Sequence, residues 1–281
     1  MISASALLKR FKKTKTLPHV AIQLTRLMAD ENSSAQAFED IIKLDPTLVL
    51  RLLRLVNSPY YGVQQRIESI TRAVVFIGMK NLRNMVVTEA LRDIFKEGSD
   101  KDVFSRRQLW MHSAAMSVCC QMIAERIFGD NGENAFLCGI LHDIGLIVQD
   151  QVVHDQLIQV CQAYEPGTQP ITEYENAIIG VDHSTIGQTL ARDWKLPVEI
   201  QDGIKKHHRV LANIEPSSIA GIVQIAELIV SKLDYPALPG MEPTISPPLT
   251  DHIRDNMAEY RTLTRDLPEE MAKARDLYEV D

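Results

Sequence analysis

Hydrophobic side chains recur along most of the chain with the spacing of an α-helix. In residues 18–30, four apolar residues lie at positions i, i+4, i+7 and i+8, which share one helical face: Val20, Leu24, Leu27 and Met28. Strict alternation of apolar and polar residues, the pattern of a half-buried strand, does not persist for more than a few residues. The sequence therefore predicts an all-α fold.

Proline, glycine and capping residues divide this helical pattern into separate elements. Asp45 and Pro46 are expected to be the N-cap and first residue of a helix, because a proline at that position loses no hydrogen bond. Ser69 is expected to cap a helical stretch that extends to Phe95 and that Gly78 interrupts. Further helices are expected at residues 107–128, 133–148, 155–164, 183–194, 197–208, 217–233, 249–263 and 267–280.

Two stretches that do not favour helices predict a division into three parts. Residues 96–102 are polar throughout, so residues 1–98 are interpreted as one helical subdomain and residues 99–233 as a second, which contains most of the histidines. Several prolines near the start of residues 234–281 cannot continue a helix. That last part is predicted to be a linker followed by an acid-rich helical tail that docks on the body.

The acidic charge of the chain is concentrated in this tail. The formal net charge is −7, and residues 234–281 contribute eleven acidic and five basic side chains, a net of −6, which leaves −1 for residues 1–233. Nucleic acid is not expected as a partner, because its phosphates require a basic surface. A body close to neutral remains compatible with a small anionic ligand.

Other features of the sequence favour a cytoplasmic protein. The apolar runs are short and interrupted by charge, so no membrane span is expected, and the N-terminal residues lack the apolar core of a signal peptide. No C-x-x-C pair occurs among the four cysteines, which are interpreted as buried, reduced side chains without a disulfide. These are Cys119, Cys120, Cys138 and Cys161.

The histidines cluster in the middle of the chain, with six of the eight between residues 112 and 208. Imidazole binds zinc, iron, manganese or nickel, and a carboxylate can bridge two ions about 3.5–4 Å apart. His142 and Asp143 are expected to leave one helix about 100° apart, where both can bind one ion and Asp143 can reach a second. The sequence therefore predicts a metal site formed by His112, the pair His142 and Asp143, His183, and the pair His207 and His208.

Some of these residues have a second interpretation. Glu227 interrupts an apolar helix, where burial without a cation would be costly, so it is either a metal ligand or a residue of the solvent face. His207 and His208 lie beside three basic residues, and such a cationic helix end also complements the helix dipole. The remaining histidines are interpreted as structural or exposed: His19, His154 and His252.

This set of residues resembles the signature of the HD superfamily of metal-dependent phosphohydrolases. By that resemblance His112, His142 and Asp143 match the first histidine and the His-Asp pair, and Glu227 lies where a final aspartate is expected. The resemblance implies two divalent ions that activate a water, with His142 and Asp143 acting through that water. The extra residues His183, His207 and His208 are similar to the additional ligands of the HD-GYP branch, which carries di-metal or tri-metal centres.

The N-terminal half resembles a narrower family, the HDOD domain. This domain is a helical bacterial signalling module related to HD-GYP, so the resemblance implies a two-part helical bundle and a role in signal transduction. The likeness covers roughly residues 15–233. It is carried by the segments LPHVAIQLTRLM, IIKLDPTLVLRLLRLVNSPYYG, IESITRAVVFIGMKNLRNMVV and VDHSTIGQTLARDWKLPVEIQDGIKKHH.

Departures from active HD-GYP sequences leave three functions open. Leu146 stands where those sequences carry a lysine, no GYP motif follows His183, and Glu227 replaces the aspartate. We expect a regulatory signalling protein with a metal site and a signalling protein as its partner. The alternatives are an active phosphohydrolase for a phosphoester or nucleotide signal, and a protein that binds a nucleotide second messenger without hydrolysing it.

Overall fold

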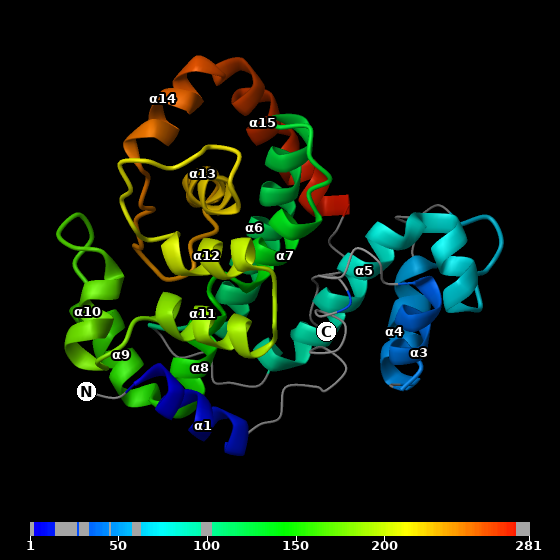
Figure 1. Cartoon of the computed structure of the whole chain (residues 1–281), viewed down its shortest axis with the longest axis horizontal. Coiled ribbons are helices and arrows are strands. Elements are labelled where there is room, and N and C mark those ends of the chain that lie inside the picture. Colours follow the sequence, from blue (N-terminus) through cyan, green and yellow to red (C-terminus); the bar gives the residue numbers. More distant parts are fainter. Residues whose placement is uncertain are drawn as a thin grey trace.

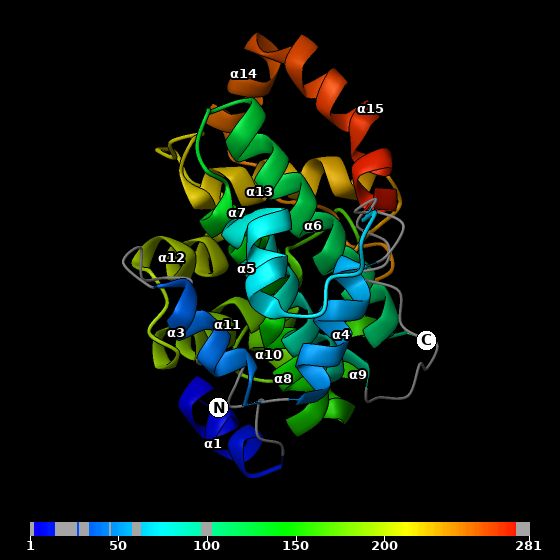
Figure 2. The same cartoon turned by 90° about the vertical axis from the view of Figure 1, so that its right-hand side faces the viewer.

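Helices form every regular element that the structure contains. The computed structural model describes residues 3–14, 27, 34–44, 46–57, 63–96 and 103–273. Within these residues there is no strand, which confirms the expected all-α fold. Two views at right angles show a helical body with α14 and α15 at one end and α1 at the other (Figures 1 and 2).

The helices follow one another with short connections. The N-terminal part contains α1 (Ala4–Thr14), α3 (Ala35–Ile42), α4 (Pro46–Val56) and α5 (Ile70–Lys96). The central part contains α6 (Arg106–Arg126), α7 (Glu133–Leu141), α8 (Ile144–Val152), α9 (His154–Ala163), α10 (Ile171–Ile178), α11 (His183–Asp193), α12 (Val198–Lys206) and α13 (Ile219–Lys232). The C-terminal part contains α14 (Pro247–Asp255) and α15 (Met257–Lys273).

The start and the interruption of α5 follow from single residues. The hydroxyl of Ser69 accepts the backbone N–H of Arg72, as expected of a cap. Gly78 interrupts the helix with φ 81° and ψ 156°, a conformation that favours glycine. Both expectations for this stretch are confirmed.

Other predicted boundaries are only partly covered by the described residues. Helix α4 begins at Pro46, as expected. Its expected N-cap, Asp45, lies outside the described residues, as do His19 and the predicted helix at residues 18–30 apart from Leu27. The boundaries expected for the last two helices, 249–263 and 267–280, were wrong, because the break lies at Asn256 and α15 continues through Pro268; residues 274–280 lie outside the described residues.

Helix α6 lies at the centre of the hydrophobic core. Its side chains are buried on nearly every side, including Trp110, Met116 and Cys119. Helices α5, α7, α13 and α15 pack against it. Because α6 is surrounded, a polar residue on it is also buried, and His112 is such a residue.

The C-terminal tail docks on the body, as the sequence predicts. Helix α15 packs against α6, and its side chains Tyr260, Leu263 and Leu267 are at most 3% exposed. At the surface, Arg126 of α6 contacts the carboxylate of Asp266 at 3.1 Å. Apolar burial stabilises this contact more than the exposed ion pair does.

Helix α1 packs on the histidine-bearing part of the chain. It contacts α8 and α11, while α3 and α4 lie on the other side of the molecule beside the first half of α5 (Figure 1). Leu7 and Phe11 of α1 are buried. The division at residues 1–98, 99–233 and 234–281 stays a prediction, and α1 shows that sequence neighbours at the N-terminus do not all pack together.

The stretch expected as one helix at residues 133–148 is two helices, and this expectation was wrong. Helix α7 ends at Leu141, and Asp143, with φ −100° and ψ 11°, precedes α8. A Cβ atom on Gly145 would overlap the backbone carbonyl of His183, so α8 approaches α11 as closely as a glycine permits. The turn lies beside this close approach, and both His142 and Asp143 are fully buried there.

The same stretch is long and apolar enough to cross a membrane when judged by length and composition alone. Among the described residues Glu133–Val152 has a mean hydropathy of 1.2 in its most apolar part, and 89% of that part is buried inside the protein. The sequence-based expectation that no such stretch exists was therefore too strict. Burial on this scale is typical of a core helix.

Candidate metal centre

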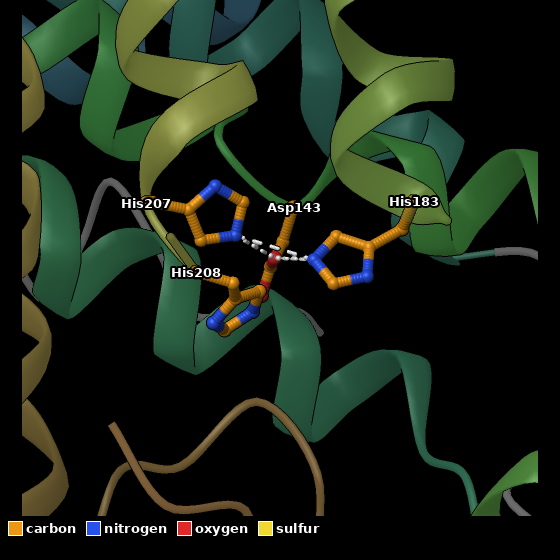
Figure 3. Close-up of side chains that lie close together, drawn as sticks. All are labelled: Asp143, His183, His207 and His208. Carbon is orange, nitrogen blue, oxygen red and sulfur yellow. Dashed lines mark hydrogen bonds and ion pairs between the residues drawn. The ribbon is translucent and has the colours of Figure 1, made fainter. Parts of the chain in front are cut away.

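Seven buried side chains form two groups that share one carboxylate. His112, His142, Asp143 and Glu227 form the first group, and Asp143, His183, His207 and His208 form the second. In each group the potential ligand atoms lie within 4.8 Å of one another. The structure thus brings together all seven residues that the sequence singles out, while His154 and His252 belong to neither group among the described residues. Figure 3 shows the second group around Asp143.

The two carboxylate oxygens of Asp143 face different groups. Oδ2 lies 3.3 Å from Nε2 of His142 and 3.6 Å from Nε2 of His112. Oδ1 lies 3.2 Å from Nε2 of His183 and 3.3 Å from Nε2 of His207. This arrangement is that of a carboxylate able to bridge two metal ions.

Glu227 belongs to the first group only. Its Oε1 lies 3.2 Å from Nε2 of His112 and 3.1 Å from Nε2 of His142. The residue is 3% exposed, so the interpretation that places it on the solvent face was wrong. Glu227 can be buried on the apolar helix α13 because its carboxylate contacts the imidazoles of His112 and His142.

The candidate ligands come from two helix interiors and from the ends of other helices. His112 comes from the middle of α6, and Glu227 comes from α13, which packs on α6. His142 and Asp143 occupy the turn between α7 and α8, and His183 is the first residue of α11. His207 and His208 directly follow α12 and are at most 6% exposed. Burial lowers the pKa of both rings, so they are not the cationic helix end of the alternative interpretation.

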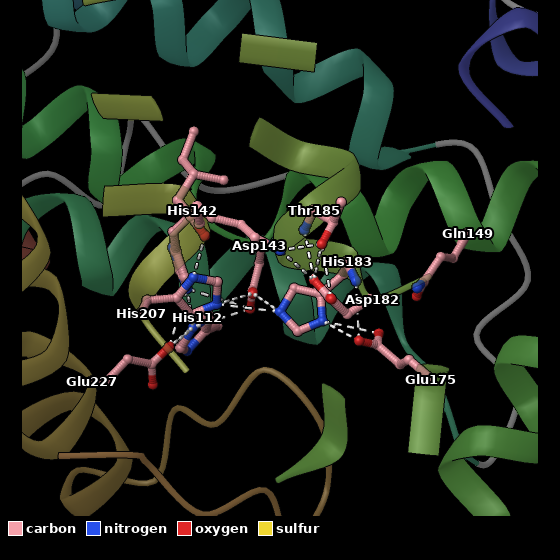
Figure 4. A network of polar contacts seen from close by, with 12 residues as sticks. His112, His142, Asp143, Gln149, Glu175, Asp182, His183, Thr185, His207 and Glu227 are labelled. Carbon is pink, nitrogen blue, oxygen red and sulfur yellow. Dashed lines mark hydrogen bonds and ion pairs between the residues drawn. The ribbon is translucent and has the colours of Figure 1, made fainter. Parts of the chain in front are cut away.

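Hydrogen bonds to the far side of each ring orient four of the five histidines. Nδ1 of His112 donates to the backbone carbonyl of Tyr235, and Nδ1 of His142 donates to that of Gly139, both at 2.7 Å. Nδ1 of His207 likewise donates to the carbonyl of Ile204 at 2.7 Å. A proton held on Nδ1 leaves Nε2 as the free metal-binding atom, and each Nε2 faces the centre (Figure 4).

The fourth ring is oriented by a carboxylate that the sequence analysis did not identify. Nδ1 of His183 lies 2.9 and 2.8 Å from the two oxygens of Glu175, and the backbone N–H of His183 donates to Glu175 at 3.0 Å. Glu175 is fully buried on α10. A carboxylate paired with a ligating histidine is common around metal ions, and an acid eight residues before His183 was the available sequence signal.

Burial and charge oppose each other at the carboxylates. Burial alone would raise the pKa of Asp143, but the neighbouring charge of His142 dominates and holds this pKa well below its usual value. Burial likewise opposes ionisation of Glu227, yet the charges of His112 and His142 lower its pKa. Both carboxylates are therefore ionised at neutral pH and available to a cation.

The buried histidines differ in their affinity for protons, and each group contains one ring with a raised pKa. Burial lowers the pKa of His142, but Asp143 and Glu227 outweigh burial and raise that pKa to about 10. In the second group burial lowers the pKa of His183, but Glu175 and Asp143 outweigh burial and raise it well above its usual value. For His207 and His208 burial prevails, and their pKa values are lowered. These two rings are neutral at neutral pH, which is the form that binds a metal.

The contacts inside the centre fit bound cations. Once His142 and His183 give up the second proton that their raised pKa values retain, two acceptors lie opposite each other, at 3.0 Å between Nε2 of His112 and His142 and at 3.2 Å between Nε2 of His183 and His207. Both oxygens of Asp143 are buried, and the groups that face them are ring nitrogens at 3.2–3.6 Å. A divalent ion in each group would satisfy these atoms, and the mixed nitrogen and oxygen donors suit zinc, iron, manganese or nickel.

Comparisons with known proteins identify the domain and its fold. Residues 15–210 match the HDOD domain. A solved HDOD domain protein of unknown function from Geobacter sulfurreducens is 25% identical, with a TM-score of 0.79 over 98% of each chain. A solved Shewanella amazonensis protein, provisionally described as a phosphohydrolase, is 26% identical with a TM-score of 0.68 over 97% of this chain and 95% of its own.

The sequence is also similar to part of a longer protein. An uncharacterised protein of Treponema pallidum is 25% identical over 234 residues, which make up 82% of this chain and 45% of the relative. The chain thus spans less than half of the length of that relative. The HDOD match ends before Glu227 and Tyr235, so part of the site comes from helix α13 and the segment after it.

Proposed function

Because the chain belongs to the HDOD domain family, we propose that it acts in signal transduction through a centre of two divalent metal ions that hydrolyses a phosphoester. The observation that carries this proposal is Asp143, whose two oxygens face two separate groups of imidazoles. Similarity to the Shewanella protein described as a phosphohydrolase supports the same reaction class.

The proposal assigns distinct tasks to the residues of the centre. His112, His142 and Glu227 would hold one ion, His183, His207 and His208 the other, and Asp143 both. When bound, such ions polarise a phosphoryl oxygen and lower the pKa of a water. The chain keeps the imidazoles in the required tautomer through their Nδ1 partners, and the surrounding core excludes bulk water.

Metal analysis of the purified full-length chain and its variants tests the centre. Asp143→Ala should lose both ions because both groups share this residue, and His208→Ala should lose the ion of its own group only. His154→Ala is the matched control, because this histidine pairs with Asp150 outside the centre and should keep the full metal content. A wild-type protein that takes up no metal when zinc, iron or manganese is added, and melts at the temperature of Asp143→Ala, would refute the centre.

A panel of substrates tests the reaction. Phosphomonoesters, phosphodiesters, nucleotides and cyclic dinucleotides are incubated with the metal-loaded protein, and phosphate or product release is measured. Turnover of at least one of them should exceed the Asp143→Ala background. Equal rates for wild type and Asp143→Ala throughout the panel would contradict hydrolysis and leave the metal centre in place.

A regulatory protein without turnover is the second candidate function. Each group offers four protein ligands and is almost fully buried, which is typical of a closed structural zinc site. Leu146, where active relatives in HD-GYP carry a lysine, is also buried. Four-coordinate zinc in absorption spectra would favour this candidate, whereas six-coordinate iron or manganese leaves open positions for water and substrate. Stabilisation by a nucleotide second messenger whose mass stays unchanged would likewise indicate binding without hydrolysis.

The proposal also includes a cytoplasmic location and a signalling protein as partner. All four cysteines are free thiols, which suits a reducing compartment. Cys119, Cys120 and Cys138 are buried as expected, whereas Cys161 is partly exposed. Crosslinking in cells followed by mass spectrometry tests both points, because it reports the compartment and identity of the proteins that the chain contacts.

A further inference from the structure

A cleft of about 520 Å³ lies beside the metal centre. One of its walls is α10, the other is the end of α12 with the residues that follow it, and the start of α11 contributes Asp182 and Ser184. Of the seven candidate ligands, His208 is the one that lines this cleft among the described residues. The cleft therefore meets the centre on the side of the group formed by His183, His207 and His208.

Two cations of the cleft come from the end of α12. The ammonium group of Lys205 lies 3.5 Å from a carboxylate oxygen of Asp182 and donates a hydrogen bond to the hydroxyl of Thr185. Arg209 lines the same wall, and its side chain is exposed. Lys205 is thus held in place at the cleft, and Arg209 is free to reach into it.

A buried hydroxyl without a partner lies at the same place. Ser184 is 2% exposed, and its Oγ makes no hydrogen bond among the described residues. Nε2 of His208 has no hydrogen-bond partner either. Leaving buried polar groups unsatisfied is costly. His208 is already a candidate ligand of the metal centre, so it is the hydroxyl of Ser184 that points to a polar ligand entering from the cleft.

The opposite wall has a different chemistry. Thr172, Glu173 and Asn176 of α10 line it, and these side chains accept hydrogen bonds from hydroxyl or amino groups. Asp182 already receives the backbone N–H and hydroxyl of Thr185, so Glu173 is the acid of the cleft that is left to receive a ligand donor.

We infer that the cleft binds a phosphomonoester with a hydroxylated body, whose phosphate contacts Lys205, Arg209 and Ser184 next to His208. This inference rests on the proposed function and names its substrate class. The anionic end of the ligand faces the two cations, and the hydroxyl-bearing end faces Glu173 and α10. The volume is in the range of small-ligand sites and accommodates one sugar or nucleoside unit. Lys205 of α12 thereby supplies a cation beside the phosphate. Leu146, which stands where active HD-GYP sequences carry a lysine, has no charge to supply.

Calorimetric titration of the full-length chain with inorganic phosphate, AMP and adenosine tests this inference. AMP and phosphate should bind, and adenosine should bind at least about tenfold more weakly than AMP, because it lacks the group that the cations contact. Lys205→Met and Arg209→Gln should each raise the Kd of AMP about tenfold or more. Ser184→Ala should raise it by a smaller factor.

Lys206→Met is the matched control, because Lys206 follows Lys205 directly but pairs with Asp202 at 2.6 Å and does not line the cleft. It should bind AMP as the wild type does. Metal content is measured for every variant and should not change, which separates this test from that of the centre itself. Equal AMP affinity in Lys205→Met, Arg209→Gln and Lys206→Met would overturn the inference even if metal binding and turnover are confirmed.

Discussion

Glu175 accepts the Nδ1–H of His183 at 2.8 Å, and the opposite nitrogen of the same ring lies 3.2 Å from Asp143. The buried carboxylate of α10 thus decides which nitrogen of His183 is available to a metal ion. An interaction of this kind fixes the orientation of a ligating ring and raises its basicity.

Replacing this carboxylate should weaken metal binding without removing a ligand. For Glu175→Gln we expect a loss of metal affinity of about 10–100-fold, since a neutral amide holds the ring less firmly. Competition with a chelator of known affinity measures the change. Glu173→Gln is the control on the same helix, because Glu173 is exposed and should leave metal affinity unaltered. Equal affinities in the two variants would contradict the orienting role of Glu175.

Metal affinity should rise with pH. Asp143 and Glu227 raise the pKa of His142 to about 10, so in the metal-free protein this ring carries a proton that a metal ion must displace. Calorimetry in buffers of different ionisation enthalpy should detect proton release on binding at pH 7, and the release should decrease as the pH approaches 10. Binding at pH 7 without any proton release would contradict the raised pKa.

The same proton should affect the stability of the metal-free protein in the opposite direction. Because the pKa of His142 is raised in the folded state, its contribution to stability is fully present below about pH 6.5 and is lost as the pH rises toward 10. Urea unfolding in the presence of a chelator should therefore show lower stability at pH 10 than at pH 7. In Glu227→Gln this decrease should be smaller, because one of the two carboxylates that retain the proton is gone.

The close approach of α8 to α11 should not tolerate a methyl group. In Gly145→Ala the added Cβ would overlap the backbone carbonyl of His183, which cannot rotate away. We expect a destabilisation of about 2–3 kcal/mol and a lower metal content, because His183 shifts with its backbone. At Gly187 the nearest atom is a side-chain methyl of Ile204 at 2.9 Å, so Gly187→Ala should cost less. Denaturant unfolding of both variants decides between these outcomes.

The tail should be held by apolar contacts rather than by its ion pairs. Leu263→Ala removes a side chain that is 1% exposed between α15 and the body, and we expect a loss of about 2–5 kcal/mol. Arg126→Ala breaks contacts to Asp266 and Glu270 whose side chains are 33% and 29% exposed, and should cost about 1 kcal/mol or less. A larger effect of Arg126→Ala in chemical unfolding would show that the ion pairs dominate.

Local patterns were enough to predict the all-α class, several helix boundaries and a set of candidate metal ligands. Ser69 and Gly78 act within one or two helical turns, so their effects on α5 are visible in the sequence. Imidazole and carboxylate are the side chains that bind divalent ions, so His112 and Glu227 were identifiable although 115 positions separate their numbers. The resemblance to known families supplied the correspondence between these distant residues.

Other parts of the site depend on contacts that no local pattern contains. The turn at Asp143 interrupts an apolar stretch without a proline, because the approach of α8 to α11 requires it. Glu175 resembles any other acid of an amphipathic helix until α10 packs beside His183. The carbonyl of Tyr235 carries no side-chain signal at all, yet it orients His112.

The sequence by itself determined the helical class of this protein and the set of side chains able to bind metal, because helical periodicity and donor chemistry are properties of individual residues and their near neighbours. Only the tertiary structure decided that Asp143 faces two groups of histidines and that Glu227 is buried among them. It also placed Lys205, Arg209 and Ser184 in one cleft beside His208. The physical reason is that these relationships arise from the packing of α6, α8, α11, α12 and α13, whose contacts join residues far apart in the chain.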